Sequence, residues 1–200
     1  MDSEINTKFT IINEFFREIK ETREIVESVD RGVFIKGSMI HIFELFQDLV
    51  KQKLITKNDA FLDTGSGDGR ICVLASLFGL QSYGIEYNID IYKHSVDLLN
   101  KLDKKGIFHD GNQPKVVCGD FFDNNIYKSL NVKFHDFKII YNYTTYQNDL
   151  AEKIKEVSIA GTIFIFHSPI SLPYTFPELN LIHKKHLNGI HQVIYVFRKN

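Results

Sequence analysis

The stretch of sequence best suited to bind a small molecule is DTGSGDGR, residues 63–70, which directly follows the apolar residues 60–62. Glycine loses more conformational entropy on folding than any other residue, so three glycines at alternate positions indicate a special demand on the backbone. Gly65 and Gly67 would let the main chain approach a ligand closely, and Gly69 would let a following helix pack tightly. Taken alone, the stretch also fits an ordinary turn between a strand and a helix.

Two more acidic residues lie at corresponding places further along the chain. Glu86 comes 21 residues after Gly65, at the end of an apolar run, where a carboxylate can accept hydrogen bonds from ribose hydroxyls. Asp120, in VVCGDFF at residues 116–122, follows another apolar run and could accept a hydrogen bond from an adenine amino group. The carboxyl ends of parallel strands share one edge of the sheet, so we expect Asp63, Glu86 and Asp120 to gather there.

The spacing of the glycines and the charge of the turn indicate which ligand fits. Dinucleotide-binding turns have the pattern GxGxxG and place a pyrophosphate at a helix N-terminus, whereas this chain has GxGxG. Asp68 lies where a phosphate would be repelled, and Asp63, two residues before the first glycine, suits a positively charged amino group. A ligand that has an ammonium group, a ribose and an adenine but no phosphate is S-adenosylmethionine.

These motifs resemble those of the class I, seven-stranded S-adenosylmethionine-dependent methyltransferases. FLDTGSGDGR is similar to their first motif, GIEYN at residues 84–88 to their acidic second-strand motif, and VVCGDFF to the motif that contacts adenine. The resemblance covers residues from about 33 to 200. It implies an α/β fold, a Rossmann-like doubly wound mixed sheet of seven strands with a C-terminal antiparallel hairpin, and it implies methyl transfer from S-adenosylmethionine.

The resemblance also implies roles for individual residues of the cofactor site. Asp63 and Gly65 would hold the methionine amino group, while Ser38 would reach the methionine carboxylate. The remaining implied contacts are Gly67 at the close approach of the turn, Glu86 with the ribose, Tyr87 and Phe34 packed against the cofactor, Asp120 and the Phe121 N–H with the adenine, and Tyr141 beside the methionine part.

The segment IIYNYTTYQNDL, residues 139–150, bears on the group that is methylated. Methyltransferases that act on nitrogen in adenine or glutamine carry an Asn/Asp-Pro-Pro-aromatic motif at this place, and the chain has no proline there. Asn142 followed by Tyr143 looks more like the archaeal non-SET protein-lysine methyltransferases, as do GDGRI, GDFF and GIHQVIYVFRK. This resemblance implies that Tyr141, Asn142 and Tyr143 form the catalytic site. In such a site the rings of Tyr141, Tyr143 and Tyr146 could form an aromatic channel for the side chain of a protein lysine. The archaeal relatives have a proline-rich entry near residues 33–41, which this chain lacks.

Other interpretations of the same residues stay open. The acceptor could be a small molecule or RNA, although a formal net charge of −1 gives no general attraction to RNA phosphates. A module that binds S-adenosylmethionine without turnover is a third alternative, and its partner surface would be the apolar side of the first helix, with Phe9, Phe15 and Phe16. His167 is expected to be a hydrogen-bonded residue rather than a base, and the remaining histidines lack the companions of a metal site.

Alternating apolar and helical segments must position these residues. Residues 1–32 are predicted to form an N-terminal helical extension, which could mediate a homo-oligomer, and residues 33–200 the methyltransferase domain. A helix is predicted from Ser38, with Ile42, Phe46 and Leu49 on one face. Strands are then predicted at 60–64, 82–87, 115–120, 137–143 and 161–168, with helices at 69–79, 89–103, 124–130 and 147–157, a pattern typical of a parallel sheet. Two antiparallel strands, about 180–187 and 191–198, are predicted around Asn188-Gly189.

The composition agrees with a globular domain, since 44% of the residues are hydrophobic and 24% are charged. Cys72 and Cys118 have no metal-ligand spacing and are expected to be reduced thiols. No apolar run approaches the roughly 18 residues of a membrane span. The N-terminus lacks the pattern of a signal peptide. We therefore expect a cytoplasmic protein without a metal, whose partner is a substrate and not a membrane.

Overall fold

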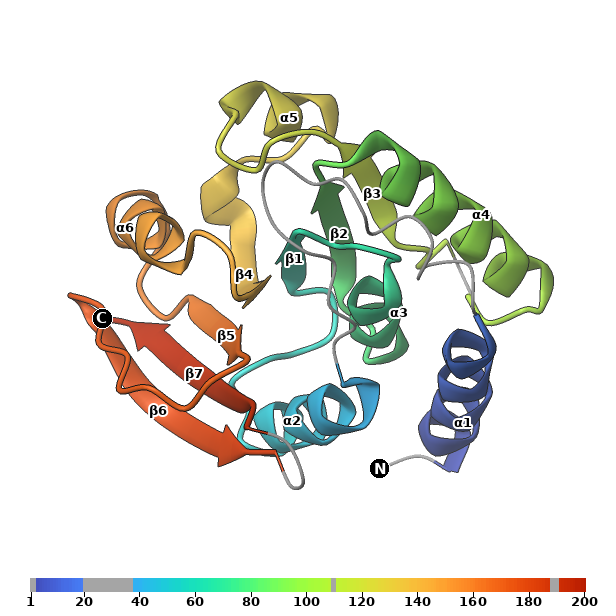
Figure 1. Cartoon of the computed structure of the whole chain (residues 1–200), viewed down its shortest axis with the longest axis horizontal. Coiled ribbons are helices and arrows are strands. Elements are labelled where there is room, and N and C mark those ends of the chain that lie inside the picture. Colours follow the sequence, from blue (N-terminus) through green and yellow to red (C-terminus); the bar gives the residue numbers. More distant parts are fainter. Residues whose placement is uncertain (1–2, 20–37, 109–110, 188–190) are drawn as a thin grey trace.

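The computed structural model describes residues 3–19, 38–108, 111–187 and 191–200 (Figure 1). The described strands form one seven-stranded sheet in the order β3-β2-β1-β4-β5-β7-β6. Strands β1 to β5 run parallel, whereas β7 is antiparallel to both of its neighbours, β5 and β6. The strands are β1 (Ala60–Thr64), β2 (Gln81–Glu86), β3 (Lys115–Cys118), β4 (Phe137–Tyr143), β5 (Ile163–Ser168), β6 (Leu179–His186) and β7 (Val193–Lys199). This confirms the predicted mixed, Rossmann-like sheet.

Helices cover both faces of this sheet and enclose two hydrophobic cores. One face carries α1 (Ser3–Glu18), α2 (Met39–Lys51), α3 (Arg70–Leu77) and α4 (Ile89–Lys104), and the other carries α5 (Asn124–Ser129) and α6 (Gln147–Val157), as Figure 1 shows. Phe61 and Ile139 belong to the first core, while their chain neighbours Leu62 and Ile140 belong to the second. Successive side chains of a strand point to opposite faces, so strands that are covered on both sides must be apolar throughout.

The predicted elements agree with the structure to within a few residues. The third strand ends at Cys118 and not at Asp120, because the Asp120 carboxylate accepts a hydrogen bond from the Phe122 N–H (2.8 Å) and so favours a turn. The first helix is described as far as Glu18. Its predicted continuation, the predicted pocket residue Phe34 and the Asn188-Gly189 turn lie outside the described residues.

The apolar stripe of α1 packs on the core of its own chain. Ile12 and Phe16 are fully buried, and the ring of Phe9 stacks on that of Phe43 in α2 with 4.0 Å between their centres. Most of the stripe that could have met a partner is therefore already covered.

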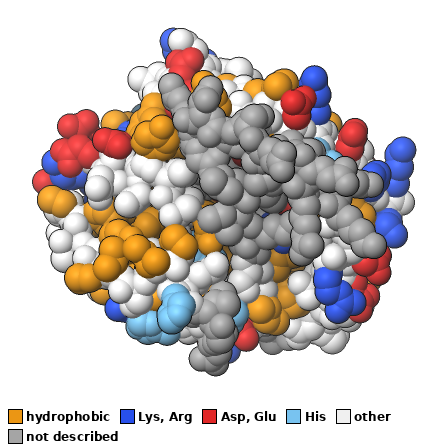
Figure 2. Space-filling model, viewed as in Figure 1, with side chains coloured by type: hydrophobic (Ala, Val, Ile, Leu, Met, Phe, Trp, Pro, Cys, Tyr) orange, Lys and Arg blue, Asp and Glu red, His pale blue; other side chains and the backbone are white. Residues whose placement is uncertain are grey.

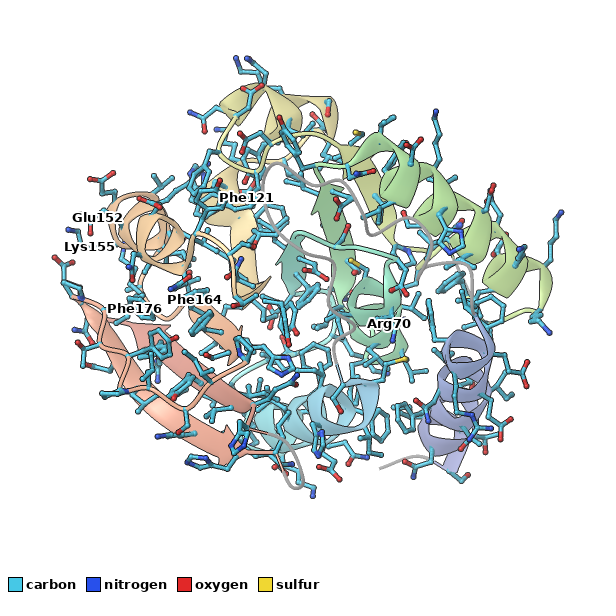
Figure 3. The ribbon with its side chains drawn as sticks, viewed as in Figure 1. Arg70, Phe121, Glu152, Lys155, Phe164 and Phe176 are labelled. Carbon is cyan, nitrogen blue, oxygen red and sulfur yellow. The ribbon has the colours of Figure 1, made fainter. Side chains whose placement is uncertain are left out.

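Residues 169–178, which connect β5 to β6 and are all described, contain no helix. Prolines at positions 169, 173 and 177 disfavour one. Phe176 from this loop covers the second core instead, with its ring centre 5.7 Å from that of Phe164 and 4.9 Å from that of Phe197 (Figure 3). An aromatic loop thus closes a part of the sheet where a helix would otherwise be needed.

We expect Phe176→Ala to lower the free energy of unfolding by about 3–4 kcal/mol, because truncation of a buried aromatic ring leaves a cavity. Urea denaturation followed by circular dichroism measures the change. Ile170→Ala is the matched control from the same loop, since Ile170 is 49% exposed and Phe176 only 7%. Equal losses from the two substitutions would contradict the role of Phe176 in the core.

Candidate functional site

The glycine-rich stretch forms the turn between β1 and α3 at the carboxyl edge of the sheet. Gly65, Gly67 and Gly69 have φ angles of 100°, 54° and 81°, in the left-handed region that glycine adopts without strain. The N–H groups of Gly65 and Ser66 donate to the carbonyl of Ile85 at 2.9 and 3.0 Å. These bonds tie the turn to the end of β2.

Gly84 in β2 is a fourth glycine of this arrangement, and the sequence analysis missed it. A Cβ atom at this position would lie 2.7 Å from Cβ of Ser66 and 2.8 Å from Sγ of Cys72. The turn can therefore lie against β2 only because residue 84 has no side chain. The available signal was a glycine inside an apolar strand, which often marks the close approach of another backbone.

Asp63 has a carboxylate that is buried and nearly unpaired. Its side chain is 2% exposed, Oδ1 has no hydrogen-bond partner among the described residues, and Oδ2 lies 4.0 Å from the thiol of Cys72. Burial, followed by the charges of Glu86 and Asp68, raises the pKa of Asp63 well above its ordinary value. A carboxylate in this setting is destabilised until a cation or a hydrogen-bond donor reaches it.

Glu86 ends β2, as predicted, and its carboxylate helps to hold the turn. It accepts hydrogen bonds from the N–H groups of Gly67 (2.9 Å) and Asn88 (2.8 Å). Burial raises the pKa of Glu86, and these hydrogen bonds act in the opposite direction. Each oxygen of an ionised carboxylate can accept more than one hydrogen bond, so Glu86 retains the capacity to bind a diol.

Asp68 is paired within the turn. Its carboxylate accepts hydrogen bonds from Nε of Arg70 at 2.9 and 3.1 Å and from Nη2 of the same side chain. Arg70, labelled in Figure 3, also lies over the ring of Phe16 in α1, 5.2 Å from its centre. The ion pair largely cancels the repulsion of phosphate that the sequence suggested for Asp68, so the preference for a ligand without phosphate depends on Asp63 instead.

Asp120, Tyr87 and Ser38 are the next predicted cofactor residues that the structure describes. Strands β3, β2 and β1 are neighbours, so Asp120 lies just beyond the strand next to Glu86. Tyr87 is 50% exposed. Ser38 directly precedes α2, where its Oγ lies 2.6 Å from Nδ1 of His41.

Phe121 is held by contacts to its carbonyl group. The hydroxyl of Tyr127 and Nζ of Lys153 both donate to this carbonyl, the latter at 3.0 Å. The ring of Phe121 is partly buried and lies 4.5 Å from that of Phe122, centre to centre (Figure 3). Its backbone is therefore fixed after β3, while part of its ring stays accessible.

Tyr141 and Tyr143 lie on one face of β4, and Asn142 lies on the other. Tyr141 is paired in register with Asp63, and its pKa is raised well above the ordinary value by burial and then by the Asp63 charge. Asn142 is fully buried and donates from Nδ2 to Oγ1 of Thr64 at 3.0 Å. The structure thus brings the two tyrosines together and places the side chain of Asn142 apart from them.

His167 at the end of β5 contacts both tyrosines. Its Nδ1 lies 3.0 Å from the hydroxyl of Tyr141, its Nε2 lies 2.9 Å from Oε1 of Gln192, and the ring of Tyr143 meets its ring edge-on at 4.4 Å. Burial lowers the pKa of His167 to about 4, so the imidazole is neutral near pH 7. The expectation of a hydrogen-bonded histidine is confirmed. Gln192 was missed, because only the pairing of β7 with β5 brings it here.

The loop after β4 has a strained backbone. Thr144 and Tyr146 have φ angles of 61° and 54°, which residues with a side chain rarely adopt. Strain of this kind is concentrated at functional sites. Tyr146 is 43% exposed and its ring lies 6.5 and 6.0 Å from those of Phe121 and Phe122, so it lies with these two phenylalanines and not with the pair formed by Tyr141 and Tyr143.

The face of the molecule in Figure 2 shows charges of both signs among its coloured residues. On the face in Figure 2, Lys and Arg side chains alternate with Asp and Glu around the edge, without a continuous basic stripe among the coloured residues. Within the described ranges, no group of His, Cys, Asp and Glu is placed to hold a metal ion. None of the helices in that part of the chain is long and apolar enough to cross a membrane.

Neither a protein-family model nor a curated protein matches this chain, but solved structures do. The RNA methyltransferase from Salinibacter ruber in complex with S-adenosyl-L-homocysteine is 19% identical, with a TM-score of 0.56 over 78% of this chain and 90% of its own. The E81Q mutant of MtNAS in complex with S-adenosylmethionine is 14% identical (TM-score 0.61, 99% and 80% covered), and MtNAS in complex with MTA and tNA is 15% identical (TM-score 0.60, 100% and 78% covered). At these identities the likeness establishes the fold alone, the Rossmann-like mixed seven-stranded sheet with C-terminal antiparallel strands that this chain shares with the RNA methyltransferase.

We expect Asp63→Asn to raise the free energy of unfolding of the free protein at pH 7 by about 1–2 kcal/mol, because it removes a buried and unpaired charge. The difference from the unchanged protein should shrink as the pH falls through the folded-state pKa of Asp63, which is raised. Urea denaturation at several pH values measures both effects. Asp97→Asn, at an exposed position on α4, is the control and should change stability by less than about 0.5 kcal/mol. Destabilisation by Asp63→Asn would show that the carboxylate is paired after all.

The lowered pKa of His167 predicts a loss of stability in acid. The folded protein binds this proton only near pH 4, whereas the unfolded chain binds it near pH 6.5, so stability falls as the pH decreases between these values. The contribution of His167 is a loss of roughly 2 kcal/mol between pH 7 and pH 5. His167→Asn removes the titrating group, so urea denaturation of this variant should show a smaller decrease over that range. Identical decreases would mean that His167 titrates normally.

Proposed function

We propose that this protein transfers the methyl group of S-adenosylmethionine to an amine, the side chain of a protein lysine. The observation that carries the proposal is the buried Oδ1 of Asp63, which has no hydrogen-bond partner in the described part of the chain and lies beside a turn of three glycines with positive φ. The methionine part of S-adenosylmethionine carries an ammonium group, and its attraction to this carboxylate would offset the desolvation of both.

The neighbouring residues suit the rest of the cofactor. Glu86 would accept hydrogen bonds from the ribose, and the exposed ring of Tyr87 would pack on the adenine. Asp120 and the N–H of Phe121 would meet the edge of the adenine. Solved structures with this fold hold S-adenosyl-L-homocysteine and S-adenosylmethionine, which supports the choice of cofactor. We keep the division into a helical extension, residues 1–32, and a methyltransferase domain, residues 33–200.

The acceptor is inferred from the chemistry of the adjoining strand ends. The sulfonium provides a good leaving group, so the protein needs mainly to place the nucleophile in line and to strip it of water. Tyr141 is the register partner of Asp63, and Tyr143 lies two residues further along the same face of β4. Aromatic rings attract an alkylammonium chain through cation–π interactions. This pair, together with the sequence resemblance around Asn142, supports a lysine side chain as the acceptor.

A second candidate function uses the same cofactor and breaks a different bond. Attack at the methyl carbon leaves S-adenosylhomocysteine, whereas attack at the carbon of the aminocarboxypropyl group next to sulfur leaves methylthioadenosine. The two MtNAS structures, one of them with MTA, match 99% and 100% of this chain, whereas the RNA methyltransferase matches 78%. This wider match, which takes in the N-terminal helices, supports transfer of the aminocarboxypropyl group as the alternative.

The test is incubation of the protein with a cell extract and S-adenosylmethionine labelled either in the methyl group or in the carboxyl carbon. Protein, RNA and small molecules are then separated, and the nucleoside product is identified by chromatography. We expect methyl label on protein that resists mild alkali, lysine as the modified residue by mass spectrometry, and S-adenosylhomocysteine as the product.

Matched variants and the other outcomes separate the hypotheses. Asp63→Asn should weaken S-adenosylmethionine binding by roughly tenfold or more in calorimetry and abolish labelling, while Asp97→Asn should retain both. Methyl label confined to RNA or small molecules would refute the lysine acceptor. Carboxyl label with methylthioadenosine would refute methyl transfer. Cofactor binding without any transfer would leave a non-catalytic binding module.

A further inference from the structure

Three side chains form one hydrogen-bonded chain across the strand ends on the acceptor side. The Tyr141 hydroxyl lies 3.0 Å from Nδ1 of His167, and Nε2 of His167 lies 2.9 Å from Oε1 of Gln192. Tyr141 is 2% exposed and His167 is fully buried. Tyr141 lies in β4, His167 lies in β5, and Gln192 directly precedes β7. The hydrogen bonds therefore join segments that are far apart in the sequence.

The partners fix the position of each proton in this chain. The side-chain oxygen of Gln192 can only accept, so Nε2 of His167 must carry the ring proton. A neutral imidazole has one such proton, and Nδ1 is therefore an acceptor for the O–H of Tyr141. The same imidazole supports the second tyrosine, because the ring of Tyr143 meets it at 4.4 Å and an angle of 79°.

We infer that His167 is a positioning residue of the acceptor site, and that Gln192 holds it in the Nε2–H tautomer so that Nδ1 fixes Tyr141 and the ring fixes Tyr143. The inference rests on the proposed function, since it assigns these tyrosines to the acceptor. It also excludes His167 as the base, because Nε2 carries a proton and Nδ1 is occupied by the hydroxyl of Tyr141. An ammonium acceptor must then lose its proton to solvent or to a group other than His167 before the methyl group moves.

The groups around His167 keep it neutral over the working range of pH. Burial is the main cause of its low pKa, the bond to Gln192 opposes it, and the charge of His41 in α2 lowers the pKa further. Tyr141 and Tyr143 of β4 face it as uncharged rings, and the charge of Asp63 acts on Tyr141. Activity should therefore rise with pH as the acceptor amine loses its proton, without an inflection from His167.

The first experiment reads the tautomer directly. Long-range ¹H–¹⁵N correlation spectra of the full chain, recorded from pH 5 to pH 9, should show His167 as the neutral Nε2–H form throughout. Tyr141→Phe should shift the Nδ1 resonance, and Gln192→Leu should give a mixture of tautomers. A predominant Nδ1–H form, or titration of His167 near pH 6.5, would overturn the inference whether or not any activity is found.

The second experiment separates the two contacts of His167. In His167→Asn the amide oxygen lies near the position of Nδ1 and can still accept from Tyr141, whereas in His167→Gln the amide lies near Nε2 and cannot. The measurement is the rate of methyl transfer from labelled S-adenosylmethionine to the cell extract. We expect the asparagine variant to keep at least about a third of this rate, and the rate of the glutamine variant to fall roughly tenfold or more. Both should bind S-adenosylmethionine with a dissociation constant within about twofold of the unchanged protein, as should the exposed control His135→Gln.

Combined substitution completes the test. Tyr141→Phe should lose as much transfer as His167→Gln, and the double variant should lose no more than either, because both remove the same hydrogen bond. Equal activity of the asparagine and glutamine variants, or additive losses in the double variant, would refute the positioning role while methyl transfer itself stands. Absence of transfer by the unchanged protein would instead refute the proposed function.

Discussion

The site depends on one constraint, the burial of the Asp63 carboxylate, whose Oδ1 has no hydrogen-bond partner among the described residues. A charge removed from water without a partner destabilises the fold, so the surrounding structure has to supply the stability that keeps it there. The glycine turn is tied to β2 through the carbonyl of Ile85 and through Glu86, and Gly84 lets the two backbones meet. Among the described residues nothing donates a hydrogen bond to Oδ1 of Asp63, so this part of the structure is suited to an added cation.

The sheet topology places a second group of residues beside that carboxylate. Strand β4 pairs with β1, β5 pairs with β4, and the reversed β7 pairs with β5, so the start of β7 lies at the same edge as the ends of the parallel strands. The reversal therefore brings Gln192 to His167, and His167 to Tyr141. If β7 ran parallel to β5, its carboxyl end, and not the residue before its start, would lie beside His167.

The N-terminal helix α1 is coupled energetically to the glycine turn through Arg70. Arg70 pairs with Asp68 inside the turn and lies against Phe16 of α1, while Phe9 of the same helix stacks on α2. A desolvated ion pair is sensitive to whatever covers it, so the packing of α1 affects the stability of the turn as well as that of the core.

The sequence by itself determined the strands, most of the helices and the position of the three acids at or just beyond successive strand ends, because these depend on local pattern: apolar runs, glycines at alternate positions and short spacings. It also indicated that Tyr141 and Tyr143 belong together, since residues two apart on a strand share a face. Only the tertiary structure decided that Asn142 faces Thr64, that Asp68 is neutralised by Arg70, that Gly84 is required by Ser66, and that Gln192 reaches His167. Apart from the pair within the turn, these contacts join residues that are 18 to 78 positions apart, or they depend on which face of a strand a side chain occupies. The order of residues along the chain shows neither of these two properties directly.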